Sequence, residues 1–350
     1  MTLGPLMIDL TGPRIDAEEG ELLRHPLVGG VILFTRNFVD SEQLRALVAA
    51  IHAARTPPLI VTVDHEGGRV QRFRSTFSIL PAARLIGRQF DADARGGLNL
   101  ARRMGWLMAA ELRAHGVDHS FAPCVDLDYG VSSVIGDRAF HARADAVAQL
   151  AAAYVHGMRD GGMAATAKHF PGHGAVHADS HHSLPVDRRA LADLSEDLAP
   201  YRRLIEGGLP GVLVAHVLFP AVDARPASAS RRWIREILRQ ELRFQGAVFA
   251  DDLSMGAAAT EGDIVARAER ALAAGCDMLP ICNDRAAVVT ALDRLKVSPV
   301  PASHVRIVRM RGRGGLAWPQ LIETEEWKQA RALLASVNQA PPLTLRPGAS

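Results

Sequence analysis

The stretch from Lys168 to Pro185, KHFPGHGAVHADSHHSLP, is unusually rich in residues that could do chemistry. It holds five histidines and one aspartate among two glycines and two prolines, so an ordinary helix is not expected there. Three kinds of site use imidazoles in this way. They are a zinc site, a serine nucleophile with a histidine base, and a carboxylate–imidazole pair that transfers a proton.

The spacing of the histidines argues against zinc. His169 and His173 are four residues apart, as on a metalloprotease helix, but Pro171 and Gly172 lie between them and would break that helix. No glutamate stands at the position that such a motif requires. We therefore expect no metal and no cofactor.

Asp179 and His181 are better candidates, as an acid/base pair. Ser180 lies between them, too close in sequence to both for a serine triad, and no GxSxG motif occurs. Residues two apart on an extended loop point to the same side, so the carboxylate can fix the imidazole tautomer and raise its pKa from ~6.5. Gly172 and Gly174 would let the loop close over a substrate. Incidental histidines on a surface loop are the alternative.

The elements that must position this loop alternate along the chain. Short apolar runs separated by helix-forming stretches predict a parallel sheet covered by helices. The eight strands are expected at 6–10, 29–34, 59–64, 119–126, 164–170, 211–217, 247–252 and 277–283. Eight is the number that closes a barrel, and the glycine-rich turn of a doubly wound sheet is missing. We predict an α/β fold with a single (β/α)₈ TIM-type barrel.

Polar residues fall at the carboxyl ends of these strands, where such a barrel carries its catalytic groups. They are Asp9, Asp64, Asp126, Lys168, His169, His216, Asp251, Asp252 and Asn283. Helix capping would explain one or two aspartates, but Lys168 at a helix N-terminus would oppose the macrodipole. Two adjacent aspartates cannot both face one substrate atom, so we expect Asp252 to orient the turn. Asp126 and His216 could serve either the site or the packing.

Composition limits the class of protein. The 350 residues are 48% apolar and 22% charged, which predicts a well-buried core, and the net charge of +2 argues against a nucleic-acid partner. Three cysteines without a paired framework, no leader-like N-terminus and no long apolar run predict a cytoplasmic protein without a membrane span. We expect residues 1–300 to form the barrel, and 301–350 a helix and tail of the same domain.

Four longer motifs add a family resemblance. VDHEGGRVQRF, SVIGDRAF, AKHFPGHGAVHADSHHSLP and FADDLSM occur in the order and spacing of single-domain bacterial β-N-acetylhexosaminidases of glycoside hydrolase family 3. The chain resembles these proteins from about Leu6 to at least Asn283. The resemblance implies a retaining mechanism in which Asp251 is the nucleophile and His181, assisted by Asp179, is the general acid/base. The substrate contacts that it implies are Asp64, Arg72, Arg138, Lys168 and His169.

The resemblance also implies a substrate. Family members release N-acetylglucosamine from anhydromuropeptides during cell-wall recycling, so we expect a carbohydrate substrate and a monomeric enzyme. An imidazole in place of the usual second carboxyl group leaves an alternative open. Phosphate could approach the glycosyl-enzyme, which would make the protein a phosphorylase. A sugar-binding sensor without activity is the other alternative, although every catalytic position is filled.

Overall fold

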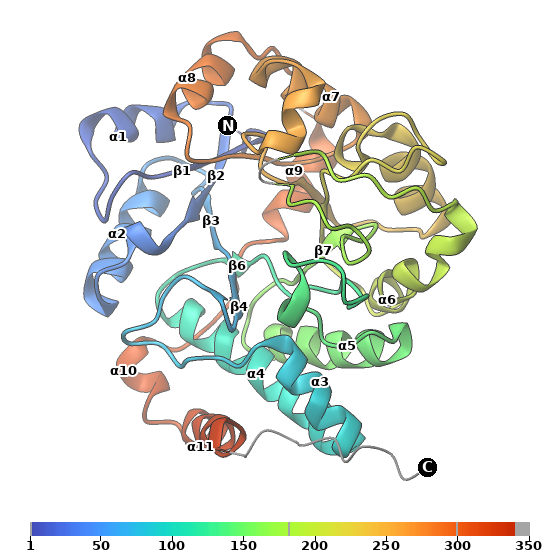
Figure 1. Cartoon of the computed structure of the whole chain (residues 1–350). Helices are drawn as coiled ribbons and strands as arrows, with labels where there is room; N and C mark the ends of the chain where they lie inside the picture. Colours follow the sequence, from blue (N-terminus) through green and yellow to red (C-terminus); the bar gives the residue numbers. More distant parts are fainter. Residues whose placement is uncertain (1, 181–182, 299, 340–350) are drawn as a thin grey trace.

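Parallel strands form the centre of the computed structural model, which describes residues 2–180, 183–298 and 300–339 (Figure 1). The larger sheet has the order β10 (Leu279–Ile281), β1 (Leu6–Asp9), β2 (Val28–Leu33), β3 (Ile60–Val63) and β6 (His119–Ser120). The smaller sheet has the order β7 (Thr166–Phe170), β8 (Gly211–Val214) and β9 (Ala247–Ala250). The predicted α/β fold with parallel strands is therefore present.

Among the described residues, isolated bridges alone connect the two sheets, so the predicted barrel is not closed by continuous ladders. One seam pairs His119 with Ala164 and Cys124 with Lys168, and the other pairs Phe249 with Met278. The strand predicted over 119–126 accordingly shortens to β6. A proline lies at each seam, Pro123 and Pro280, and proline has no N–H to donate to a ladder.

Helices surround the strands (Figure 1). They are α1 (Ala17–Arg24), α2 (Ser41–Ala53), α3 (Ala83–Ala92), α4 (Ala94–Ala114), α5 (Ala144–Asp160), α6 (Ser195–Glu206), the π-helix Arg232–Glu241, α7 (Ile264–Ala274), α8 (Arg285–Arg294), α9 (Pro301–Val308), α10 (Trp318–Leu321) and α11 (Glu325–Gln339). Several begin at an aspartate whose carboxylate accepts a backbone N–H of the first turn, as Asp40 and Asp263 do.

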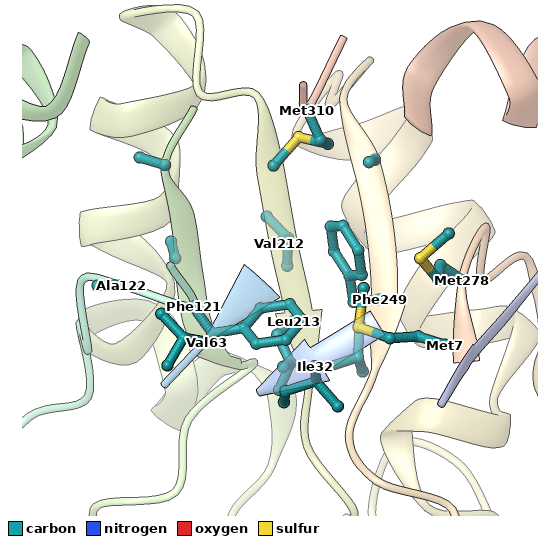
Figure 2. Packing of buried hydrophobic residues seen from close by; sticks show 14 of the residues in the cluster. Met7, Ile32, Val63, Phe121, Ala122, Val212, Leu213, Phe249, Met278 and Met310 are labelled. Carbon is teal, nitrogen blue, oxygen red and sulfur yellow. The ribbon is translucent and has the colours of Figure 1, made fainter. Parts of the chain in front are cut away.

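Side chains from both sheets fill the interior between them (Figure 2). Met7 and Val63 come from the larger sheet and Phe249 from the smaller one, and all are fully buried. The ring of His119 packs in the same core, 5.1 Å from the ring centroid of Phe121 and 5.4 Å from that of Phe249. The space enclosed by the strands is thus a packed core rather than a channel.

The C-terminal helix packs on the outside of the fold, and the cysteines lie inside it. The helix expected within residues 301–350 is present as α11, which packs against α4, and the shorter helices α9 and α10 precede it. Cys124, Cys276 and Cys282 are free and buried, and burial raises the pKa of each thiol. Among the described residues, no helix is both long and apolar enough to cross a bilayer.

Candidate active site

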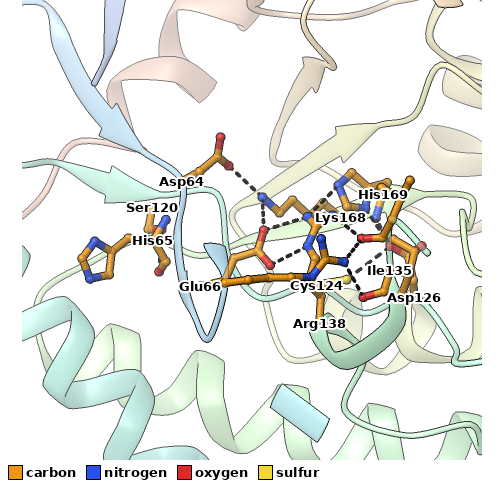
Figure 3. Close-up of polar contacts among 12 residues, drawn as sticks. Asp64, His65, Glu66, Ser120, Cys124, Asp126, Ile135, Arg138, Lys168 and His169 are labelled. Carbon is orange, nitrogen blue, oxygen red and sulfur yellow. Dashed lines mark hydrogen bonds and ion pairs between the residues drawn. The ribbon is translucent and has the colours of Figure 1, made fainter. Parts of the chain in front are cut away.

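The predicted substrate-binding residues gather where β3 and β7 end (Figure 3). Asp64 follows β3, and Lys168 and His169 belong to β7. Arg138 ends a short 3₁₀ helix between β6 and α5. Elements far apart in the sequence therefore bring these polar side chains to one place.

Glu66 joins these groups and was not among the predicted site residues. Its carboxylate accepts hydrogen bonds from Nε and Nη2 of Arg138 at 2.9 and 2.8 Å, and Oε1 lies 2.6 Å from Nζ of Lys168. The same Nζ donates to Oδ1 of Asp64 at 2.8 Å. One carboxylate thus fixes both cations, and the second carboxylate shares the lysine.

The charges of this cluster stabilise one another. Burial alone would raise the pKa of Glu66, but Arg138 and Lys168 outweigh it and hold that pKa below its ordinary value. Burial alone would lower the pKa of Lys168, but Asp64 and Glu66 raise it above its ordinary value. All of these groups therefore carry their charges at neutral pH. Each buried charge is paired with an opposite one, which is the condition under which buried ions are tolerated.

A β-hairpin after β3 carries Glu66. Its strands are β4 (His65–Gly67) and β5 (Val70–Gln71), and both Gly67 and Gly68 at the turn have positive φ, at 107° and 55°. Such φ values favour glycine. Arg72 follows the hairpin, with Nη2 3.8 Å from Oδ2 of Asp64. A carboxylate two residues after Asp64 and ahead of a Gly-Gly turn was the available sequence signal for Glu66.

Hydrogen bonds fix the tautomer of His169. Its Nε2 lies 3.2 Å from Nη2 of Arg138, and arginine can only donate, so Nε2 accepts. The ring proton is therefore on Nδ1, which lies 2.6 Å from Oδ2 of Asp126. Asp126 also accepts the backbone N–H of His173 at 2.8 Å. Its role in the structure is to hold His169 and the start of the histidine-rich loop.

The first half of that loop is packed rather than open. His173 is buried, and its Nε2 lies 3.3 Å from Oγ of Ser180. A Cβ added at Gly174 would lie 1.8 Å from the carbonyl oxygen of Leu127, so this glycine allows close packing. The prediction from the sequence was that Gly174 gives the loop freedom to close.

The predicted acid/base pair lies at the edge of the described structure. Asp179 is half-buried, and its carbonyl oxygen accepts the N–H of Ser183 at 3.0 Å. His181 lies outside the described residues. The pairing of Asp179 with His181 therefore stays a prediction.

The two aspartates after β9 play different structural parts, as expected. Asp252 accepts hydrogen bonds from Ser254 and from the N–H of Cys282, so it orients the turn, and burial raises its pKa to about 6. Asp251 is half-buried, and its Oδ1 accepts the N–H of Asp252 at 3.0 Å.

Asp251 lies near two buried histidines, His173 and His216. Burial lowers the pKa of both His173 and His216, and the charge of Asp251 acts on both in the opposite direction. The loop that begins after β7 and the turn after β9 therefore approach the same region. His216 itself is buried, with Nδ1 2.6 Å from Oγ of Ser228 and Nε2 3.0 Å from the carbonyl oxygen of Asp252, so it supports the turn.

One group of the described residues has the chemistry of a metal site. Potential ligand atoms of Cys124, Asp126 and His169 all lie within 4.8 Å of one another. The thiol of Cys124 donates to Oδ2 of Asp126 at 3.3 Å, and His169 donates to the same oxygen. These hydrogen bonds account for the arrangement without an ion.

Comparisons with known proteins identify relatives of the chain. Residues 4–310 match the glycosyl hydrolase family 3 N-terminal domain. The chain is 52% identical to a β-hexosaminidase of Thioalkalivibrio sulfidiphilus over 345 residues, 99% of either chain, and 54% identical to one of Alkalilimnicola ehrlichii over 332 residues, 94% of this chain and 95% of that one. The crystal structure of NagZ from Neisseria gonorrhoeae in complex with N-trifluoroacetyl-D-glucosamine superposes with a TM-score of 0.92 at 42% identity and covers 97% of this chain and 99% of that one.

These similarities place the protein among enzymes that act on carbohydrates. The chain belongs to glycosyl hydrolase family 3, and it is a glycoside hydrolase. The family resemblance expected from the four sequence motifs is thereby confirmed.

Proposed function

We propose that the protein is a retaining β-N-acetylglucosaminidase that releases terminal N-acetylglucosamine from anhydromuropeptides in cell-wall recycling. Curated β-hexosaminidases that are similar over nearly the whole chain support the activity, and the N-acylated glucosamine in the Neisseria structure supports the choice of sugar. The observation that carries the proposal is the cluster of Asp64, Glu66, Arg138 and Lys168 at the carboxyl ends of β3 and β7.

The cluster provides the kinds of group that bind a sugar ring. Lys168 and Arg138 donate hydrogen bonds and Asp64 accepts them. A sugar hydroxyl therefore finds a partner whether it accepts or donates a hydrogen bond. We propose that Arg72 and His169 complete the set. Because the two cations are already held by Glu66, little side-chain freedom is lost when the sugar binds.

In the proposed mechanism, a carboxylate oxygen of Asp251 attacks the anomeric carbon and the bond to the leaving oxygen breaks. His181, its tautomer set by Asp179, gives its proton to that oxygen. Water then attacks the glycosyl ester, His181 takes a proton back, and the sugar leaves with its original configuration while Asp251 is regenerated. An imidazole base brings no second negative charge beside the intermediate.

We further propose that the two sheets form one (β/α)₈ barrel over residues 1–300, and that residues 301–350 belong to the same domain. The bridges at both seams support the barrel. The ion pair of Arg306 with Asp277 and the contact of α11 with α4 support the single domain. The working state would be a cytoplasmic monomer.

The test is covalent trapping. A 5-fluoro analogue of N-acetylglucosamine with an activated leaving group should label the peptide that contains Asp251, as read by mass spectrometry. Asp251→Asn should lower kcat/KM for a chromogenic N-acetyl-β-glucosaminide by about 10³-fold or more, as loss of a nucleophile does. A label on another peptide would refute the mechanism. A kcat/KM for the corresponding chromogenic β-glucoside equal to that for the N-acetyl-β-glucosaminide would refute the sugar specificity.

The same assay decides between the alternatives. Formation of N-acetylglucosamine 1-phosphate in phosphate buffer, with slow turnover in its absence, would indicate a phosphorylase. Sugar binding without any turnover would indicate a sensor. We expect rates that do not depend on phosphate.

A further inference from the structure

A buried carboxylate on α4 holds the chain segment that supports the candidate site. Glu111 is only 2% exposed. It accepts the N–H and the hydroxyl of Ser78 at 2.9 and 2.7 Å, and Nε1 of Trp327 in α11 at 2.9 Å. Burial raises the pKa of Glu111, and the hydrogen bonds from Ser78 and Trp327 offset this effect only in part. A buried carboxylate is unfavourable unless its oxygens are hydrogen-bonded, so its three donors matter to the fold.

The segment fixed by Glu111 is tied in turn to the hairpin that carries Glu66. Gln71, the last residue of β5, is buried, and its Nε2 donates to the carbonyl oxygens of Phe73 and Ser78 at 3.0 and 2.9 Å. Its Oε1 accepts the N–H of Leu80 at 3.0 Å. Gln71 pairs with His65 across the hairpin.

Aromatic packing makes this connection stiff. The ring of His65 lies 5.8 Å from that of Phe73 and 5.6 Å from that of Phe77. Phe73 and Phe77 lie 5.5 Å apart. Ser78 follows Phe77 directly, so a shift of Ser78 away from Glu111 would be passed to His65 and then to its neighbour Glu66.

We propose that Glu111 is a positioning residue for the hairpin of β4 and β5, which carries Glu66. Through Glu111, Trp327 couples the C-terminal helix α11 to the candidate site. This inference rests on the proposed function. Trp327 lies beyond residues 4–310, the part that matches the family domain. Residues outside that domain therefore take part in placing Glu66 and Arg72. Displacement of binding groups by about 1 Å lowers activity by about 10²-fold, so small shifts are measurable.

The experiment compares Glu111→Gln and Trp327→Phe with Asp277→Asn in the full chain. Asp277 is the control because it is also a buried carboxylate that accepts one backbone N–H, from Val248, and one serine hydroxyl, from Ser303; unlike Glu111, it also binds two arginines. Asp277 lies at the amino ends of the parallel strands, whereas the candidate site lies at their carboxyl ends. Each variant is assayed for kcat and KM with the chromogenic N-acetyl-β-glucosaminide, below its own unfolding temperature.

We expect Glu111→Gln to raise KM about tenfold and Trp327→Phe about threefold, with kcat changed less in both, because misplaced binding groups weaken the hold on the sugar. Asp277→Asn should lower the unfolding temperature and leave KM unchanged. If Glu111→Gln lowers the unfolding temperature and leaves KM at the wild-type value, the carboxylate is merely structural and the inference is wrong.

Two further measurements keep the test decisive. If Glu111→Gln does not fold, Ser78→Ala, which removes the hydroxyl donor alone, takes its place with an expected KM increase of about threefold. If the wild type does not cleave the substrate at all, the proposed function fails separately. Hydrogen exchange of the hairpin amides then tests the positioning role. Exchange at residues 65–71 should be faster in Glu111→Gln than in Asp277→Asn, and equal rates would refute it.

Discussion

The two ends of the parallel strands both bury ions, but they use them differently. At the carboxyl ends, Glu66 contacts side chains alone, the two cations Lys168 and Arg138 (Figure 3). At the amino ends, Asp118 accepts the N–H of Val61 at 2.9 Å, and Asp277 accepts that of Val248 at 2.9 Å. A carboxylate that binds backbone holds neighbouring strands together, whereas a cluster of side chains can exchange partners with a ligand.

Arginines also lie close to the two carboxylates at the amino ends of the strands. Arg239 and Arg306 both pair with Asp277, and Arg113 lies 3.7 Å from Asp118. These pairs join helices to the strands that they cover. Burial and charge alone therefore do not identify a functional site in this fold. Among the described residues, Glu66 differs from these two amino-end carboxylates because its partners are side chains alone, whereas Asp118 and Asp277 also bind backbone N–H groups.

The largest effect on this comparison is expected from Glu66→Gln. The amide cannot balance Lys168 and Arg138 together, so both cations lose their fixed positions, and we expect kcat/KM to fall by about 10²-fold. The free energy of unfolding should also fall, by roughly 3 kcal/mol. Steady-state kinetics and denaturant unfolding measure the two effects. Activity near the wild-type level would show that the carboxyl-end cluster is structural, like its counterpart.

A smaller effect, confined to stability, is expected from Asp277→Asn. Arg239 and Arg306 would keep their charges without a carboxylate, which should reduce the free energy of unfolding by on the order of 3 kcal/mol. The kcat/KM of the folded enzyme should not change. A loss of activity in the folded variant would remove the distinction between the two ends.

The smallest effect concerns acid stability and His119, which begins β6. This ring is fully buried, neither nitrogen has a hydrogen-bond partner among the described residues, and burial lowers its pKa to about 4. The unfolded chain takes up the proton near pH 6.5 and the folded one does not. Stability is therefore lost as the pH falls below about 6.5, by about 2 kcal/mol at pH 5.

His119→Leu should remove this part of the pH dependence. The difference between the unfolding free energies at pH 7 and pH 5, from denaturant titrations, should be about 2 kcal/mol smaller in the variant. His156→Leu, on the exposed face of α5, is the control for removing a histidine. An unchanged difference in His119→Leu would mean that the buried ring is not a source of acid sensitivity.

The sequence predicted the strands and the residues at their ends better than the links between them. Alternation of apolar runs and helices located β1 to β3 and β7 to β10, because burial of whole strands leaves continuous apolar stretches. Asp252 as the residue that orients its turn is confirmed. The assignment followed from a physical argument about two adjacent carboxylates and needed no knowledge of the fold.

Features that depend on contacts between distant segments were missed. Glu66 in a run of polar residues gives no sign that Arg138 will approach it, since 72 residues separate them along the chain. The strand over 119–126 was predicted too long because its apolar residues continue past Ser120, whereas beyond β6 this segment pairs with β7 only by an isolated bridge, Cys124 with Lys168. Gly174 was expected to allow motion, but a carbonyl oxygen of a distant loop explains it.

The state of the three thiols makes the loop accessible to spectroscopy. Because Cys124, Cys276 and Cys282 are all buried with raised pKa values, the native protein should react slowly with maleimides. A single cysteine introduced at the exposed position His177 could then carry a fluorescent or spin label without removal of the native ones. Such a reporter would follow the loop in real time as a sugar binds and leaves.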